Sequence, residues 1–409
     1  MNPVLLLVAL LVAAYLGGLV SSKRTLNLSS GGEFLVIGAL VGPTMLGFVD
    51  RETLDSFRPL LLMALGWMAA VHGLSHGALG AGAVRARSYF ASVFATSVAA
   101  AVMGTCAFFI SGFLGAFSGD ERFLIALAAA SVLSGTRELH FPSSDLPSAT
   151  RYRAEIGNSH NLVGLGLLAA IPSLVPPEAA FRLPSWSWPL LGVATGIVLG
   201  VTVASLIGAS LHRAELWPIL LGAVLMTVGL SLRFDLPLLP PAFVLGSTVV
   251  ALSPEAAKVR ALTQKTERPL VLPVTILAGA FIAWQMPSVT WLFVGCMVVL
   301  RGLVQYALGR VFTAGAGSVS AGAHVFALSF LPVGASSLAI GLTILFWDEG
   351  MVGRSAFAMA AVALILGDLL GTRALGRVAL VSESDPAPAP EPDAQEDEEP
   401  AARPEEEAV

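Results

Sequence analysis

The sequence predicts an all-α protein that crosses a membrane many times. Hydrophobic residues make up 55% of the 409 residues and charged residues only 12%, whereas a soluble domain has about 25% charged residues. The apolar residues come in runs of about 17 or more, long enough to cross a hydrocarbon core about 30 Å thick as helix. The runs lack the period-two alternation of a membrane β-barrel.

We expect about thirteen membrane helices, a number set by runs long enough to span the bilayer. The shortest two, 122–136 and 237–252, are rich in small residues. The expected spans are 3–20, 33–49, 57–75, 88–114, 122–136, 158–175, 188–210, 216–232, 237–252, 269–284, 289–310, 323–346 and 355–375.

The loop charges predict the orientation. Of the 23 Lys and Arg residues, fifteen lie in loops after odd-numbered spans and six in loops after even-numbered spans. By the positive-inside rule the N-terminus lies outside and the C-terminus in the cytoplasm of a multi-pass protein of the cell (cytoplasmic) membrane. Because Lys23 and Arg24 follow the first span and no basic residue precedes it, we do not expect a cleaved signal.

The chain divides into residues 1–380, the transmembrane domain, and residues 381–409, a tail. From Ser382 onward the tail is rich in Pro, Ala and Glu, with eleven acidic residues and almost nothing apolar. Such a segment cannot bury enough apolar surface to fold. We expect a disordered, acidic cytoplasmic tail.

The second span contains a distinctive glycine pattern, Gly38-Ala-Leu-Val-Gly42-Pro43-Thr44-Met-Leu46-Gly47. A Gly-Pro pair inside a span loosens the helical hydrogen bonding and lets backbones approach closely, so a kinked packing helix is its structural interpretation. The spacing of Gly42, Pro43 and Gly47 resembles the G-x-x-L-G-P-x-x-L-G signature in the second helix of the monovalent cation:proton antiporter-2 family, the Kef-type exchangers and their relatives.

Further stretches resemble this family in the same order along residues 3–376. They are 238–246, similar to its "pLLGAFlAG" helix, 268–273, where it has "l-P-l-F-F", and 329–337, where it has a "p-R-G-e" turn. The resemblance implies two inverted repeats, each with one broken helix, that cross near the midplane. It also implies a homodimer in the lipid bilayer that transports monovalent cations and protons.

Two segments suit the role of the broken helices. One is Ser131-Val-Leu-Ser134-Gly135-Thr136 in the fifth expected span, and the other is Leu331-Pro332-Val333-Gly334-Ala-Ser336-Ser337 in the twelfth. Both place glycine and hydroxyl residues at membrane depth, where unwound backbone would free carbonyl and N–H groups to hold an ion. Ordinary small-residue helix packing is the other interpretation of each segment.

One element of the family pattern is missing. The family's sixth helix carries Asn-Asp or Asp-Asp, and this carboxylate alternately binds a proton and a cation. Aligning Glu155 with the family's upstream Glu places Ser159-His160 on that pair, and a shift by one residue places His160-Asn161 there. Neither alignment supplies an aspartate, and Val333 stands where the family commonly has Arg.

Three explanations remain open. In the first explanation His160 carries the proton, because imidazole titrates near neutrality. A nearby carboxylate replaces the aspartate, with Glu138 preferred over Glu155 and Asp368. In the third explanation exchange is lost, and the protein either transports something else or is a non-transporting homologue that acts as a membrane sensor or scaffold.

The expected function is secondary active transport of Na⁺ or K⁺ against protons, with altered ion selectivity as an open variant. Mid-span Arg301 is a candidate to pair with Asp368, since a charge at that depth is rarely idle. The residues expected at the ion site are Ser134, Thr136, Glu138, Ser159, His160, Asn161, Pro332, Gly334, Ser336 and Ser337.

Several other functions find no support in the sequence. It has no phosphate loop, hydrolase elbow, Cys/His metal motif or DNA-binding module. We therefore expect a transporter rather than an enzyme, with no cofactor, no metal and no nucleic-acid partner. Cys106 and Cys296 both fall inside spans and are interpreted as core residues, not as a disulfide.

Overall fold

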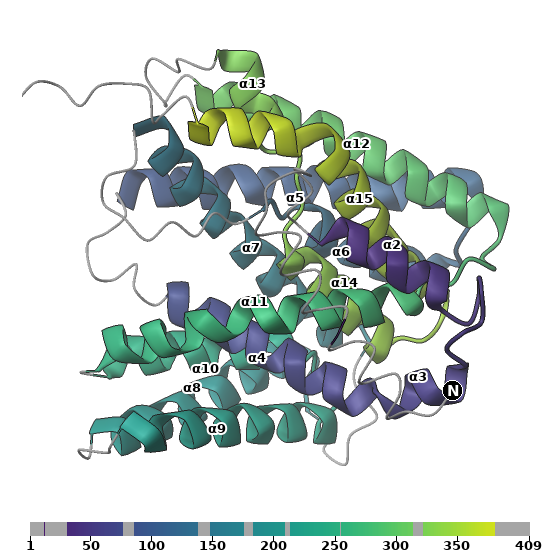
Figure 1. The fold of residues 1–409 in the computed structure, drawn as a ribbon. Coiled ribbons are helices and arrows are strands. Elements are labelled where there is room, and N and C mark those ends of the chain that lie inside the picture. Colours follow the sequence, from purple (N-terminus) through teal and green to yellow (C-terminus); the bar gives the residue numbers. More distant parts are fainter. Residues whose placement is uncertain are drawn as a thin grey trace, which may run out of the picture.

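The computed structural model describes Val12 and residues 31–76, 86–137, 148–175, 183–208, 213–253, 255–313 and 322–380. Every regular element within these ranges is a helix, as predicted (Figure 1). The first expected span, apart from Val12, and the acidic tail lie outside the described residues.

Most of the described helices follow the expected spans, but the helices of the sixth and tenth spans begin at Ser148 and Ala256, ten and thirteen residues earlier than expected. The described helices are α2 (Gly32–Val41), α3 (Arg51–Ser56), α4 (Arg58–His76), α5 (Ala86–Leu114), α6 (Gly119–Leu133), α7 (Ser148–Leu174), α8 (Ser187–Gly208), α9 (Arg213–Arg233), α10 (Leu239–Leu252), α11 (Ala256–Ala280), α12 (Ser288–Thr313), α13 (Ala323–Leu328), α14 (Ala335–Trp347) and α15 (Met351–Leu380). Each expected span from the second onward corresponds to one helix, except the twelfth, which is α13 and α14. The short helix α3 was not expected.

The helices identify a multi-pass membrane protein. In α4, α5, α8, α9, α12 and α15 the structure has six helices long and apolar enough to cross a membrane by length and composition. Shorter apolar stretches lie in α2, α7, α10, α11 and α14. The shorter ones pack among the longer ones, so the protein itself satisfies helix ends that lie at membrane depth.

Several sequence interpretations require correction. Cys106 is only half-buried and Cys296 is exposed, so they are not the buried core residues that were expected. The expected sixth span begins at 158, whereas α7 begins at Ser148, so Arg153 is not a loop residue and is fully buried. The Gly-Pro pair does not kink a continuous helix. Instead α2 ends at Val41, and Gly42 caps it with an extended backbone, because the residue before a proline is disfavoured in the α-helical region. Gly47 follows in a left-handed turn with φ +64°.

The helix contacts repeat within the chain. Helix α4 packs on α10 and α2 packs on α11; likewise α5 contacts α6 and α7, while α12 contacts α13 and α15. These pairs are related if α2, α4, α5, α6 and α7 correspond in order to α10, α11, α12, α13–α14 and α15. Corresponding helices are an odd number of expected spans apart, so they cross the membrane in opposite directions. This is the inverted repeat that the sequence resemblance implies.

Glycines show the same symmetry at the residue level. A Cβ on Gly73 would collide with the Phe243 carbonyl, and a Cβ on Gly246 would collide with the Ala70 carbonyl, so α4 and α10 are in backbone contact. Gly279 and Gly38 meet the carbonyls of Leu35 and Ile276 in the same way between α11 and α2. In every case the contacted residue lies three positions before the glycine of the partner helix. The contact between α4 and α10 and the contact between α2 and α11 therefore have equivalent geometry.

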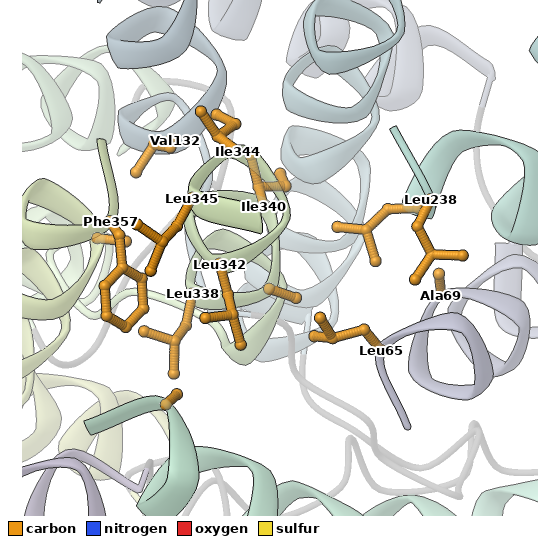
Figure 2. Close-up of a cluster of buried hydrophobic side chains, with 14 of the residues drawn as sticks. Leu65, Ala69, Val132, Leu238, Leu338, Ile340, Leu342, Ile344, Leu345 and Phe357 are labelled. Atoms are coloured by element: carbon orange, nitrogen blue, oxygen red, sulfur yellow. The ribbon is translucent and has the colours of Figure 1, made fainter. Parts of the chain in front are cut away.

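Two groups of helices enclose α14. The crossing bundle consists of α5, α6, α7, α12, α13 and α15, and the flanking bundle consists of α2, α4, α8, α9, α10 and α11. Every residue of α14 from Ser337 to Leu345 is buried. Its aliphatic side chains pack toward Val132 and Phe357 of the crossing bundle and toward Leu65 and Leu238 of the flanking bundle (Figure 2). Helix α14 therefore contacts both bundles.

Candidate functional site

Two helices of the crossing bundle are interrupted at the same place. Helix α6 ends at Leu133, and residues 134–137 continue without helix up to the end of that described range. Helix α13 ends at Leu328 and α14 begins at Ala335, with residues 329–334 unwound between them. The backbone N–H of Arg137 donates to the Pro332 carbonyl at 2.9 Å. We call these two touching segments the crossing.

The sequence explains why the second helix breaks here. Pro332 has no N–H and disfavours α-helical backbone at Leu331. Gly334 is the extended N-cap residue of α14. A Cβ on Gly334 would lie 3.1 Å from Ser336 Oγ and 3.3 Å from the Thr136 carbonyl, so a larger residue would crowd the crossing.

Two arginines hold the unwound segments together. Arg301 of α12 donates to the carbonyls of Leu331 at 2.8 Å and Gly135 at 2.9 Å. Arg153 of α7 donates to the Ser329 carbonyl at 2.9 Å and makes a longer bond of 3.5 Å to the Arg137 carbonyl. Each guanidinium thus bridges both segments. We call Arg153 and Arg301 the arginine clamps.

Amide side chains satisfy further carbonyls of the first segment. Gln305, one turn after Arg301 on α12, donates to the Ser134 carbonyl at 2.9 Å. Asn161 of α7 donates to the Thr136 carbonyl at 3.3 Å. These carbonyls follow the C-terminal end of α6, where the helix dipole is negative and donors are favoured.

His160 lies between the crossing and an aromatic cluster. Its Nδ1 is hydrogen-bonded with Thr136 Oγ1 at 3.1 Å. Its ring centroid is 6.2 Å from that of Phe312 and 6.0 Å from that of Phe330. The Arg153 guanidinium lies 4.2 Å above the Phe330 ring, a cation–π arrangement. His160 is therefore fully buried, polar on one side and apolar on the other.

Two neutral oxygen atoms converge beside Gly135. A Cβ built on Gly135 would collide with Asn161 Oδ1 and would lie 2.6 Å from Ser337 Oγ. Only glycine leaves these oxygens room at this point. Ser337 is fully buried, and within the described ranges its hydroxyl, like that of Ser336, has no hydrogen-bond partner.

Not every expected site residue faces the crossing. The Ser159 hydroxyl is hydrogen-bonded with Ser92 Oγ of α5 at 2.7 Å and lies 3.0 Å from the Ile156 carbonyl, so it joins two helices. The Ser134 hydroxyl bonds back to the Ser131 carbonyl of its own helix at 3.4 Å, and only its carbonyl serves the crossing. Glu138 and the Glu155 side chain lie outside the described part of the chain.

The expected pairing of Arg301 with Asp368 is not what the structure shows. Arg301 donates to backbone carbonyls, whereas Asp368 of α15 accepts a backbone hydrogen bond from Gly32 and interacts electrostatically with Arg137. Asp368 thus links the crossing to the start of α2.

Two of the most important residues were misjudged or missed in the sequence. Arg153 was counted as a loop charge, although it precedes His160 by seven residues and so shares its helix face. Gln305 was overlooked, although it follows Arg301 by four residues on one face of α12. The sequence signal for both residues was their spacing: each lies one or two helical turns from another polar residue at membrane depth, which predicts that the two share a helix face.

Comparisons with known proteins identify the fold. The sequence matches no family model and no curated protein. The structure is similar to that of the sodium proton antiporter MjNhaP1 from Methanocaldococcus jannaschii at pH 8, with a TM-score of 0.62 over 94% of this chain and 100% of that chain. The chain has the fold of a sodium proton antiporter. Sequence identity is 12%, so the likeness concerns the fold alone.

This finding confirms the expected fold class. The all-α polytopic architecture and the antiporter-like fold are confirmed, whereas membership of the cation:proton antiporters and of their antiporter-2 branch stays a prediction. The structure also brings Thr136, His160, Asn161 and Ser337 together at the crossing. Their role in transport is a prediction, which we develop below.

Proposed function

We propose that the protein is a secondary transporter that exchanges a monovalent cation, Na⁺ or K⁺, for protons. The observation that supports this most is the crossing of two unwound segments inside a helical membrane protein. Unwound backbone at membrane depth is tolerated only where it is buried in protein or lines a water-filled path. In transporters such segments form the substrate site, and the similar solved structure is that of a sodium proton antiporter.

Within the crossing we assign the cation to neutral oxygens and the proton to His160. Ser337 Oγ and Asn161 Oδ1 approach Gly135 together, which suits a small cation stripped of water. His160 contacts the same segment through Thr136. Imidazole is the side chain whose charge changes most readily near neutral pH. Glu138 remains the carboxylate we would test beside it.

Transport by alternating access requires the two bundles to separate on each side in turn. On one side they are joined by Arg58, at the start of α4, which pairs with Glu349 after α14 at 2.5 Å. Arg58 also donates to the Phe346 carbonyl at 2.7 Å. We propose that this side faces outward, in a cytoplasmic-membrane homodimer with its N-terminus outside, and that these contacts open when the site is exposed there.

The arginine clamps favour the alternative function, a non-transporting homologue that senses or scaffolds. A cation bound 4 Å from a guanidinium is disfavoured by about 4 kcal/mol at an effective dielectric constant of about 20. In the described ranges the hydrogen bonds of both clamps go to carbonyls and none to a carboxylate. If the two guanidiniums permanently occupy the place of a cation at the crossing, the fold would be retained while exchange is lost.

A vesicle assay separates the two functions. The purified protein is reconstituted with an imposed pH gradient, and an internal pH dye is followed after Na⁺, K⁺ or Li⁺ is added. We expect dissipation that depends on the cation and falls at least about tenfold in His160→Ala, as for loss of a positioned proton carrier. His324→Ala, an exposed histidine bonded to Tyr306, is the matched control and keeps full activity.

Glu138→Gln is assayed alongside, because a loss there would assign the proton to that carboxylate instead. If no cation dissipates the gradient and the protein is shown to be folded, the antiporter proposal is wrong and the non-transporting function is favoured.

A further inference from the structure

The arginine clamps are buried cations whose hydrogen bonds, among the described residues, include none to an acidic side chain. Arg153 is fully buried and Arg301 is 3% exposed. The hydrogen bonds that they make go to backbone carbonyls of the crossing. Asp368, the buried carboxylate nearby, interacts with Arg137 instead. A buried charge is strongly disfavoured unless it is paired with an opposite charge and hydrogen-bonded.

Each clamp also keeps a donor that the protein does not use. Nη1 of Arg153 and Nε of Arg301 have no acceptor in the described part of the structure. Nε2 of His160, which interacts electrostatically with both guanidiniums, has no hydrogen-bond partner there either. Three buried side chains that are hydrogen-bonded to the unwound segments thus each keep one nitrogen atom without a partner among the described residues.

Helix α14 adds further donors at the same place. Its N-terminus begins directly after the crossing, and its N-cap residue Gly334 makes no side-chain capping bond. The hydroxyls of Ser336 and Ser337 in its first turn have no partner among the described residues. The N-terminus of a helix carries the positive end of the dipole and exposes N–H groups, which favours anions.

A purely structural role explains only part of this arrangement. The clamps complement the carbonyls that follow the C-terminal ends of α6 and α13, and that role accounts for the hydrogen bonds that are made. It does not account for the unused N–H groups on the same guanidiniums, or for the fact that no described carboxylate is hydrogen-bonded to either of them. A ligand that accepts hydrogen bonds and carries negative charge would pair with the unused N–H groups and neutralise the guanidinium charge.

We propose that the crossing binds a small monovalent anion of the chemistry of chloride or nitrate against Arg153 and Arg301. The anion is small because both side chains and His160 are almost wholly enclosed by protein. It accepts hydrogen bonds from the spare guanidinium N–H groups and from the first turn of α14. The binding of this anion stands on the clamps and does not require that the protein transports anything.

The anion gives the proposed exchange a physical basis, and this second step rests on the proposed function. Repulsion by a guanidinium whose charge is not neutralised would weaken the binding of a nearby cation roughly a thousandfold. A bound anion supplies the negative charge that no carboxylate supplies among the described residues of the crossing. Cation exchange should then depend on the anion present.

Thermal unfolding of the purified wild-type protein tests the binding. Melting temperatures are compared in sodium chloride, sodium nitrate and sodium gluconate at equal ionic strength, with gluconate as the anion too large for the site. We expect chloride or nitrate to raise Tm by several degrees, about the effect of a ligand at a hundred times its Kd, and the rise to saturate with concentration. Equal melting temperatures in the three salts would overturn the proposal.

Variants locate the site. Arg310→Gln removes an exposed arginine from the same helix as Arg301 and should keep the anion-dependent rise. Arg153→Gln should abolish it. Because that variant can fail to fold, Arg153→Lys serves as the second test: it keeps the charge but not the fork of donors, and should shift the half-saturating chloride concentration at least about tenfold. An unchanged midpoint in Arg153→Lys would contradict the assignment.

Flux measurements separate this inference from the proposed function. Vesicles are prepared in sodium chloride or sodium gluconate, so that only the anion differs. If Tm responds to chloride but no salt supports proton flux, anion binding stands and the antiporter function fails. If proton flux is equal in both salts and Tm is unchanged, the function stands and the anion proposal fails.

Discussion

Arg301 is the residue on which the crossing depends most. It donates to one carbonyl of each unwound segment, and within the described part of the chain neither carbonyl has a second donor that could replace it. Because hydrogen bonds to charged groups contribute about 1.5–3 kcal/mol each and buried carbonyls left unpaired are costly, the side chain links local geometry to the stability of the whole bundle.

We therefore expect Arg301→Gln to destabilise the protein by about 3 kcal/mol or more, the sum of two charged hydrogen bonds. The measurement is the melting temperature in detergent, which should fall by at least about 3 °C. Arg310→Gln, which removes an exposed arginine nine residues further along α12, should melt like the wild type. A melting temperature that stays level or rises in Arg301→Gln would show that the clamp does not hold the segments.

At the scale of elements, glycines set how closely helices pack. Gly279 of α11 faces the backbone of α2, and a Cβ there would collide with the Leu35 carbonyl. Because backbone atoms cannot rotate away as a side chain can, one helix must shift. Gly295 of α12, in contrast, has nothing within 4 Å of an added Cβ.

Gly279→Ala should cost about 1–3 kcal/mol of stability through overpacking. The matched change Gly295→Ala should be neutral or stabilising by up to about 1 kcal/mol, because alanine favours helix over glycine. Melting temperatures or denaturant midpoints compare the two. Similar effects from both substitutions would mean that α2 and α11 are not in the backbone contact described.

The sequence predicted the helices more accurately than any other feature of the structure. Apolar runs located the membrane helices, because a lipid environment demands long uninterrupted apolar segments. Pro332 and Gly334 located the break before α14, since both disfavour continued helix. The start of α7 was missed because Arg153 seemed too polar for a span, although its charge is met there by carbonyls from another helix.

The site was less predictable than the fold for a physical reason. Thr136, His160 and Asn161 could be singled out as polar residues at membrane depth. That Arg153 and Arg301 reach the same pair of segments depends on how α7 and α12 pack, which no local pattern encodes. The Gly-Pro pair likewise signalled a disrupted helix, but only the fold shows that α2 ends there.

At the scale of the whole molecule, two bundles enclose α14 and are joined by Arg58 and Glu349. This pair is partly exposed, so it contributes little to stability, about 0–1 kcal/mol. Its importance lies in what it connects: α4 of the flanking bundle and the loop after α14. If the protein works by alternating access, this contact must break in every cycle.

The most direct test of the account fixes this contact. In a background with Cys106→Ala and Cys296→Ala, the substitutions Arg58→Cys and Glu349→Cys are introduced, and the two thiols are joined by a short cleavable cross-linker. Proton flux driven by Na⁺ or K⁺ is then measured in vesicles. Each single-cysteine variant, treated identically, is the control for labelling alone.

We expect the cross-linked protein to lose at least about 90% of the flux, as alternating access requires bundle separation, and to recover it when the linker is cleaved. Full flux with the linker in place would contradict the central claim that the two bundles move apart around the crossing.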